Sequence, residues 1–232
     1  FLFAFLFFMS HGPLISWNKE DKFLQIKNFK IFFPISIVIS LVIIFWFFDY
    51  KDIISILGLL FSVYLIVSVT FDWISQKKLS LNFGRLVSHL GFGTLIFAIF
   101  INAYLSKEIN AAMKVGDEIK IQEFIIKFKS INKIKKENYE EVFGNFLVTN
   151  KDKQVELTPS IRKYDQPIQF TSETSIKTNF IVDYYFAINL SEFEKDKIMV
   201  RFYYKPLMFW IWLSILLIAF GGIYQTFKLR NE

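Results

Sequence analysis

The chain has 232 residues, of which 53% are hydrophobic and 30 are phenylalanine; its formal net charge is +6 and it has no cysteine. This composition is typical of a membrane protein with a water-exposed part. The lack of cysteine excludes disulfides within the chain, thiolate metal sites and a cysteine nucleophile. Because the basic residues alternate with acidic ones or flank apolar runs, membrane topology explains the charge better than nucleic acid binding.

The chain opens on the apolar run FLFAFLFFM, which has no charged residue ahead of it and does not resemble a signal peptide. Nine residues are too few to cross a bilayer, which takes roughly 20. We therefore expect this run to be the end of a helix that begins upstream. Four further apolar runs are long enough to span the membrane. The predicted organisation is the end of a truncated transmembrane helix (1–9), a connector (10–30), a transmembrane hairpin (31–48 and 53–73), a connector (74–85), a transmembrane helix (86–105), a β-rich domain (106–206), a transmembrane helix (207–227) and a tail (228–232).

The basic residues of the short connectors predict the orientation of these spans. The segments 10–30, 76–85 and 228–232 carry four, three and two lysines or arginines, whereas the opposite turn, 49–52, carries one. Since basic connectors stay on the cytoplasmic side, we expect a multi-pass protein of the bacterial inner membrane whose residues 106–206 face the periplasm.

Residues 106–206 have the pattern of strands. Ile198, Val200, Phe202 and Tyr204 alternate with other residues, as in a half-buried strand. An antiparallel sheet or a small barrel is the expected fold of this extracytoplasmic domain. Doubled apolar positions at 124–126 suggest a bulge, and the other runs that resemble strands are 118–129, 141–148, 154–157 and 179–188.

His89 is the candidate functional residue of the spans. It lies one helical turn after Arg85, on the same helix face as Arg85 and Gly93, in a run that is otherwise apolar to Ile101. An ionisable group within a span is a functional candidate by default. Gly91 and Gly93 would let a flat ligand or another helix approach closely, so both a ligand role and a histidine packed between helices stay open.

The remaining candidates are weaker. His11 is interpreted as a loop histidine, and Met208 lies at the opposite end of its span from His89. Arg162, Tyr164, Glu173 and Asp183 have either a ligand role or a structural role in ion pairs at the edge of a sheet. Neither paired charges within the spans nor an inverted repeat is seen, which disfavours a transporter.

Four motifs occur in an order that resembles the C-terminal portion of CcmF, a family of cytochrome c-type biogenesis proteins. They are GPLISW at 12–17, RLVSHLGFG at 85–93, TPSIRKYDQPIQFTSETSI at 158–176, and YYKPLMFWIWLSILLIAFGG at 203–222. The resemblance implies a subunit of the haem lyase, which attaches haem covalently to apocytochrome c in the periplasm.

By the same resemblance, His89 would be an axial ligand of a stable b-type haem, haem b, which would reduce the incoming haem iron. The second axial histidine and the tryptophan-rich outer loop belong to the family's upstream part, so this fragment alone is not expected to be an active lyase. The expected partners are apocytochrome c, the haem chaperone and other cytochrome c maturation subunits. Arg162, Tyr164 and Glu173 are the residues expected to dock them.

Two hypotheses follow. In the first, the chain is part of a haem-handling enzyme in which His89 binds iron. In the second, it is a non-catalytic membrane scaffold or assembly factor whose periplasmic domain holds a partner and whose His89 merely packs between helices.

Overall fold

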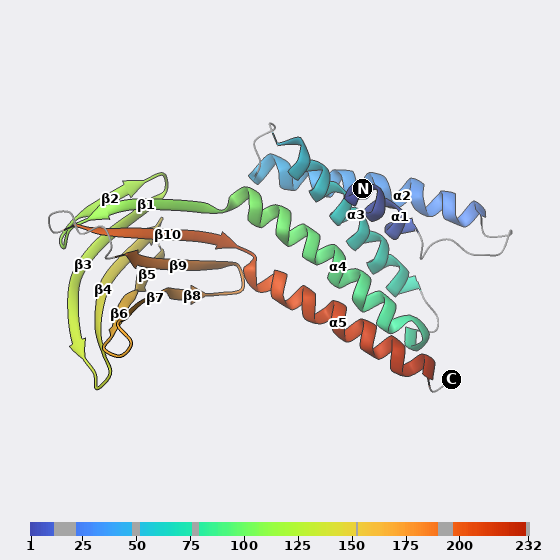
Figure 1. The fold of residues 1–232 in the computed structure, drawn as a ribbon. Helices are drawn as coiled ribbons and strands as arrows, with labels where there is room; N and C mark the ends of the chain where they lie inside the picture. Colours follow the sequence, from blue (N-terminus) through green and yellow to red (C-terminus); the bar gives the residue numbers. More distant parts are fainter. Residues whose placement is uncertain (12–21, 48–51, 76–78, 152, 190–196, 231–232) are drawn as a thin grey trace. The chain divides into compact units, whose positions relative to one another are not determined.

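The computed structural model of the chain describes residues 1–11, 22–47, 52–75, 79–151, 153–189 and 197–230. The chain divides into two compact units (Figure 1). The membrane unit comprises residues 1–105 and 207–232, and the β unit comprises Ser106–Pro206.

The described part of the membrane unit consists of helices, three of which contain stretches long and apolar enough to cross a bilayer: Ile53–Ile74, Phe83–Leu105 and Met208–Lys228. A shorter apolar stretch, Lys30–Trp46, lies in a fourth. The helices are α1 (Leu2–His11), α2 (Lys22–Phe47), α3 (Ile53–Ser75), α4 (Leu79–Leu105) and α5 (Met208–Arg230).

The helices extend into both segments predicted as connectors. Helix α2 already includes 22–30, and α4 already includes 79–85, because few helix-breaking residues interrupt these polar stretches. Helix α3 has a defined start, since the carboxylate of Asp52 accepts hydrogen bonds from the Ser55 amide at 3.1 Å and the Ser55 hydroxyl at 2.6 Å. Residues 49–51 of the predicted turn, and the GPLISW motif at 12–17, lie outside the described residues.

Within the membrane unit, α4 packs against both α3 and α5. Gly93 of α4 faces Leu65 and Ile66 of α3, whereas Gly84 of α4 lies against Gly221 of α5. Small residues let the backbones approach, which is how helices associate in a lipid environment.

The β unit consists of two antiparallel sheets (Figure 1). One has four strands in the order β1-β10-β9-β8; the other has the order β2-β3-β4-β6-β7, with β5 also paired to β4. The strands are β1 (Lys107–Met113), β2 (Glu118–Ile121), β3 (Phe124–Lys135), β4 (Tyr139–Asn150), β5 (Lys153–Leu157), β6 (Ser160–Tyr164), β7 (Gln169–Glu173), β8 (Ser175–Thr178), β9 (Val182–Asn189) and β10 (Ile198–Pro206).

The first and last strands of the β unit are neighbours. Strand β1 pairs with β10 from Lys107 opposite Tyr204 to Met113 opposite Ile198. The residues where the chain enters and leaves this unit are therefore adjacent within it.

Stacked aromatic rings form the core between the two sheets. Phe146 of β4 stacks on Phe128 of β3 and on Phe186 of β9, with ring centroids 4.3 Å apart in each pair. Phe124 meets Phe202 of β10 edge to face at 5.3 Å. These side chains are at most 1% exposed. The fold class expected from the sequence is confirmed: a helical membrane protein carries a β-rich domain before its last helix.

The bulge expected at 124–126 is not there. Phe124, Ile126 and Phe128 alternate inward in regular register, and the register shifts after Phe128, where Ser130 pairs with Asn145. The doubled apolar pattern arises because Ile125 is half-buried on the opposite face of β3. The extra residue is Lys129, whose side chain reaches Glu156 of β5.

Candidate functional site

His89 lies in α4 and is half-buried. Its Nδ1 is 2.8 Å from the carbonyl oxygen of Arg85, one turn earlier in the same helix. Because a carbonyl only accepts hydrogen bonds, Nδ1 must carry the proton. The neutral imidazole then has its lone pair on Nε2, and this is the tautomer that a histidine adopts when it binds a metal through Nε2 and donates its other N–H to a backbone carbonyl.

An ion pair between two helices lies one turn from His89. Nη2 of Arg85 in α4 is 2.9 Å from Oδ2 of Asp72 in α3. Both residues fall within the stretches that can span a membrane, so the sequence-based statement that the spans lack paired charges is wrong. With its side chain 11% exposed, Asp72 is also more buried than His89. Asp72 is the residue that sequence reasoning missed.

The glycines near His89 serve helix packing. A Cβ on Gly91 would lie 3.1 Å from the carbonyl oxygen of Ser214 in α5, and one on Gly93 would lie 2.9 Å from the Ile66 side chain in α3. Ser88 adds a hydrogen bond from its hydroxyl to the carbonyl oxygen of Ile218 at 3.1 Å. Close approach by another helix, one of the two interpretations of these glycines, is therefore present at both positions.

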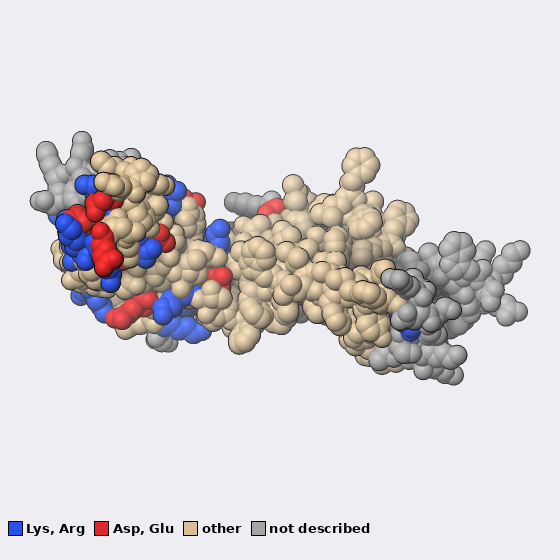
Figure 2. Space-filling model, turned by 60° about the horizontal axis from the view of Figure 1, so that its bottom comes forward, with Lys and Arg blue, Asp and Glu red and all other residues tan. Residues whose placement is uncertain are grey.

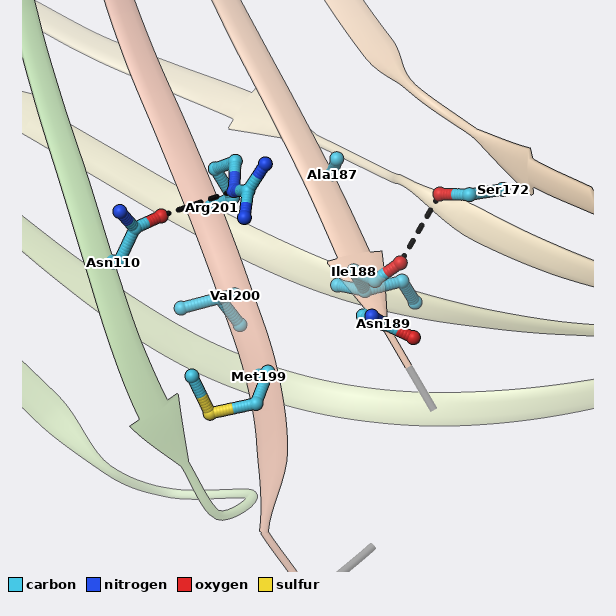
Figure 3. Close-up of a pocket in the computed structure, with 8 residues that line it drawn as sticks. All are labelled: Asn110, Ser172, Ala187, Ile188, Asn189, Met199, Val200 and Arg201. Carbon is cyan, nitrogen blue, oxygen red and sulfur yellow. Dashed lines mark hydrogen bonds between the residues drawn. The ribbon is translucent and has the colours of Figure 1, made fainter. Parts of the chain in front are cut away.

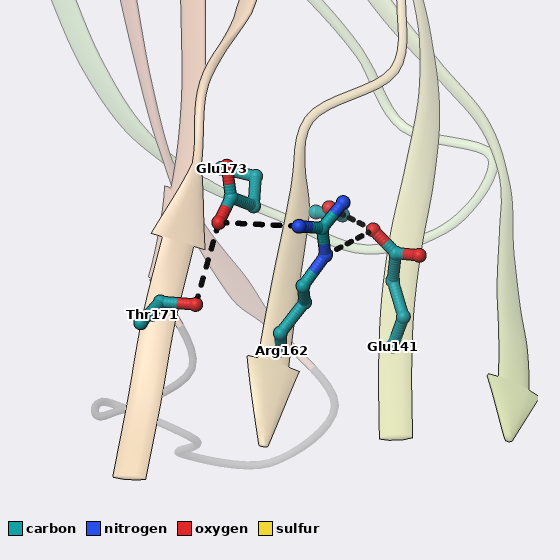
Figure 4. A network of polar contacts seen from close by, with 5 residues as sticks. Glu141, Arg162, Thr171 and Glu173 are labelled. Atoms are coloured by element: carbon teal, nitrogen blue, oxygen red, sulfur yellow. Dashed lines mark hydrogen bonds and ion pairs between the residues drawn. The ribbon is translucent and has the colours of Figure 1, made fainter. Parts of the chain in front are cut away.

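The other predicted residues lie in the β unit. Arg162 occupies the middle of β6 between two glutamates: its Nε is 3.1 Å from Oε1 of Glu141 in β4, and its Nη1 is 3.6 Å from Oε1 of Glu173 in β7 (Figure 4). The Ser160 hydroxyl donates to the same oxygen of Glu141 at 2.7 Å. The Thr171 hydroxyl is 3.4 Å from Oε1 of Glu173.

The electrostatics of this network follow from its contacts. The hydrogen bond from the Ser160 hydroxyl and the contacts of the Arg162 guanidinium lower the pKa of Glu141, and Glu141 in turn raises the pKa of Arg162. The guanidinium lies 5.2 Å from the centre of the Tyr139 ring, which is 5.4 Å from the Tyr164 ring. The structure thus brings Arg162, Tyr164 and Glu173 together. It places Asp183 in β9, where burial raises the pKa of its carboxyl.

A shallow cavity of about 480 Å³ opens on the β unit (Figure 3). Its lining includes Asn110, Ser172 and Arg201, from β1, β7 and β10. None of the predicted site residues His89, Arg162, Tyr164, Glu173 and Asp183 lines it. Among the described residues, no group of three or more His, Cys, Asp or Glu could hold a metal ion. His11 ends α1, and its side chain lies outside the description.

Charge separates the two units on the molecular surface. On the face that Figure 2 shows, lysine, arginine, aspartate and glutamate side chains are interspersed over the β unit, whereas the described surface of the helices shows almost none. The helices instead expose large apolar side chains such as Val38, Phe45, Trp212 and Leu216. The membrane unit thus presents the surface that a lipid environment requires.

Residues 104–206 match the family model described as "CcmF C-terminal beta-sandwich". The chain is 27% identical over 97% of its length to the cytochrome c-type biogenesis protein CcmF of Escherichia coli (strain K12), of which it covers 36%. The CcmF of Haemophilus influenzae is 26% identical over 97% of the chain, with 37% of that protein covered. The chain is homologous to CcmF.

The chain spans a little more than a third of the length of these CcmF relatives. Its β unit, Ser106–Pro206, is the part that matches the family model. A solved structure titled "Cytochrome c Heme Lyase CcmF" shares the fold with a TM-score of 0.72 and 15% identity, covering 96% of this chain and 38% of that one. The CcmF resemblance seen in the sequence motifs is thereby confirmed.

Proposed function

We propose that this chain acts in cytochrome c maturation as part of a haem lyase, and that His89 is an axial ligand of a b-type haem. The chain would sit in the bacterial inner membrane with residues 106–206 in the periplasm. Its partners would be apocytochrome c, the haem chaperone and other cytochrome c maturation subunits. The homology to CcmF supports the process, and the geometry at His89 supports the ligand.

The observation that carries the ligand proposal is the hydrogen bond between Nδ1 of His89 and the carbonyl oxygen of Arg85 at 2.8 Å. It fixes the ring orientation and leaves Nε2 as the basic nitrogen, which fits an axial haem ligand. A bound b-type haem would supply one-electron reduction of the incoming haem iron. The protein would contribute by holding the imidazole of His89 as the neutral tautomer within an apolar helix bundle.

Replacement of His89 by alanine in the full-length protein tests this proposal. We expect loss of the b-type absorption band, whereas Thr94→Val should keep it, because the Thr94 hydroxyl bonds to the Leu90 carbonyl of its own helix. A His89→Gly variant should regain the band when imidazole is added, since free imidazole can enter the space and bind the iron. Unchanged haem content in His89→Ala would overturn the ligand role.

We propose further that the Arg162 network in the β unit docks a partner. Glu173 and Arg162 keep 45% and 32% of their side-chain surface exposed, so both can be reached from solvent. Alanine at Arg162, Tyr164 or Glu173 should weaken cytochrome c maturation and leave the haem bound. Arg201→Ala is the matched control, because it removes the other arginine of this unit. Loss of haem in the Arg162 variant would indicate a folding role instead.

The scaffold function has one observation in its favour. Neighbouring helices already occupy the space at Gly91 and Gly93, so the small residues around His89 are explained by helix packing without a ligand. In that case His89→Ala would alter the thermal stability of the protein and leave its absorption spectrum unchanged. The same experiment therefore separates the two functions.

A further inference from the structure

We propose that Arg85 binds a propionate carboxylate of the haem held by His89. This inference rests on the proposed function and names the part of the ligand that the protein recognises besides the iron. Two observations support this proposal. Arg85 lies on the same helix face as His89, and the guanidinium of Arg85 is incompletely hydrogen-bonded.

The position suits a molecule with an apolar ring and a charged edge. Arg85 precedes His89 by four residues, so the two side chains leave the same face of α4, roughly 6 Å apart along the helix axis. Arg85 is on the side of the polar N-terminal turns of α4, whereas the residues that follow His89 are almost all apolar. A porphyrin on His89 would keep its ring among the apolar side chains and direct its carboxylates toward Arg85.

The guanidinium of Arg85 has N–H donors that its contact with Asp72 does not use. Of its five N–H groups, the contact with Asp72 Oδ2 at 2.9 Å engages one on Nη2. Its Nε is buried and has no hydrogen-bond partner within the part of the chain that the structure describes. A buried donor without an acceptor is costly, and in a native protein it calls for a ligand, an ion or a water.

The pair with Asp72 does not preclude a second carboxylate. In the β unit, Arg162 holds two glutamates at once, Glu141 at 3.1 Å and Glu173 at 3.6 Å. The planar fork of an arginine accommodates such sharing. We infer that Asp72 orients the guanidinium and balances its charge, while the remaining donors of Arg85 face the incoming carboxylate.

The test compares haem with its dimethyl ester, in which both propionates are neutral. Full-length apoprotein in detergent is loaded with either compound, and release to apomyoglobin is followed by absorption. For free-acid haem we expect release from Arg85→Gln about tenfold faster than from wild type, as for loss of one charged hydrogen bond, with Arg85→Lys between them. For the dimethyl ester, the same substitution should leave the release rate unchanged.

Charge reversal separates binding from packing. In the double variant Asp72→Arg with Arg85→Asp, the interhelical attraction is restored, so thermal unfolding of the apoprotein should resemble wild type while release of free-acid haem stays fast. Lys30→Gln, which removes an exposed lysine near the start of another apolar stretch, should change neither.

Two results would overturn the Arg85 proposal. Equal acceleration for haem and its ester in Arg85→Gln, or slow release in the charge-reversed variant, would make Arg85 an interhelical ion-pair residue only. Failure of the proposed function looks different: wild type and His89→Ala would then retain the same haem. If His89→Ala loses haem while Arg85→Gln keeps it, His89 is the iron ligand and Arg85 does not bind the propionate.

Discussion

The two units of this protein place their large aromatic residues in opposite positions, inside the β unit and on the surface of the membrane unit. In the β unit, large aromatic rings such as Phe146 and Phe186 fill the interior and charged residues cover the outside. In the membrane unit, glycines and serines such as Gly84 and Ser214 lie between helices, while Phe45 and Trp212 face outward. Water drives apolar groups together only where water surrounds the protein; among lipids, close backbone contact must stabilise the fold instead.

The largest expected effect is loss of an aromatic ring from the β unit. Phe146→Ala should lower the free energy of unfolding of this unit by about 3–5 kcal/mol, because it leaves a cavity between Phe128 and Phe186. Hydrogen exchange of the β4 amides measures the change. Phe170→Ala, at a side chain that is 62% exposed, should stay within about 0.5 kcal/mol. Similar effects at both positions would contradict an aromatic core.

In the membrane unit the damaging change is the addition of one methyl group. A Cβ on Gly221 would lie 2.5 Å from the Gly84 carbonyl oxygen, so Gly221→Ala should destabilise the packing of α4 on α5 by about 1–3 kcal/mol. Gly222→Ala is the matched control, because a Cβ there meets nothing within 4 Å. Thermal unfolding in detergent compares the two, and an equal response would argue against close backbone packing.

A smaller effect is expected at Ser88. Its hydroxyl donates to the Ile218 carbonyl oxygen across the α4–α5 contact at 3.1 Å. Ser88→Ala should cost about 0.6 kcal/mol, the average for a hydrogen bond between membrane helices. The measurement is again thermal unfolding in detergent. A loss as large as that of Gly221→Ala would mean that hydrogen bonding, rather than backbone approach, dominates this contact.

The smallest change concerns the pH dependence of the β unit. The pKa of Glu141 is lowered below 4.5 in the folded chain by the Ser160 hydroxyl and then by Arg162. Its contribution to stability is therefore complete above pH 4.5 and is lost as the pH falls through the lower, folded-state pKa. Denaturant unfolding of Glu141→Gln should show a shallower loss of stability in acid than wild type.

Asp183 provides the opposite sign for the same measurement. Burial raises the pKa of its carboxyl above 3.8, so protonation relieves an unfavourable charge as the pH falls toward the folded-state value. Asp183→Asn should be more stable than wild type near neutral pH and lose stability more steeply in acid. If Asp183→Asn and Glu141→Gln changed the profile in the same direction, these charge assignments would be wrong.

The sequence predicted those parts of the fold that have a strong local pattern. Long apolar runs identify α3, α4 and α5, and the alternation of Ile198, Val200, Phe202 and Tyr204 identifies β10. The strands β1, β6, β7 and β8 were not predicted. These strands are seven residues or fewer and contain many polar side chains. Three of them, β1, β7 and β8, lie at sheet edges and expose much of their length.

For the candidate site, the sequence identified His89 but not its surroundings. The hydrogen bond of His89 to Arg85 follows from helical spacing, whereas the pairing of Arg85 with Asp72 joins two helices and depends on how they pack. Asp72 lies close to the end of its apolar stretch, where a charged residue is ordinary in sequence. Only the three-dimensional arrangement shows that this carboxylate has a partner.

The pairing of β1 with β10 makes the β unit an inserted domain whose two ends are adjacent. Because Lys107 lies opposite Tyr204, the unit enters and leaves the chain at one place. An insertion of this kind leaves the order of the helices around it unchanged. The helices could therefore accept a different domain at this position, or a short loop from Leu105 to Leu207, so that the β unit can evolve separately from the helix that carries His89.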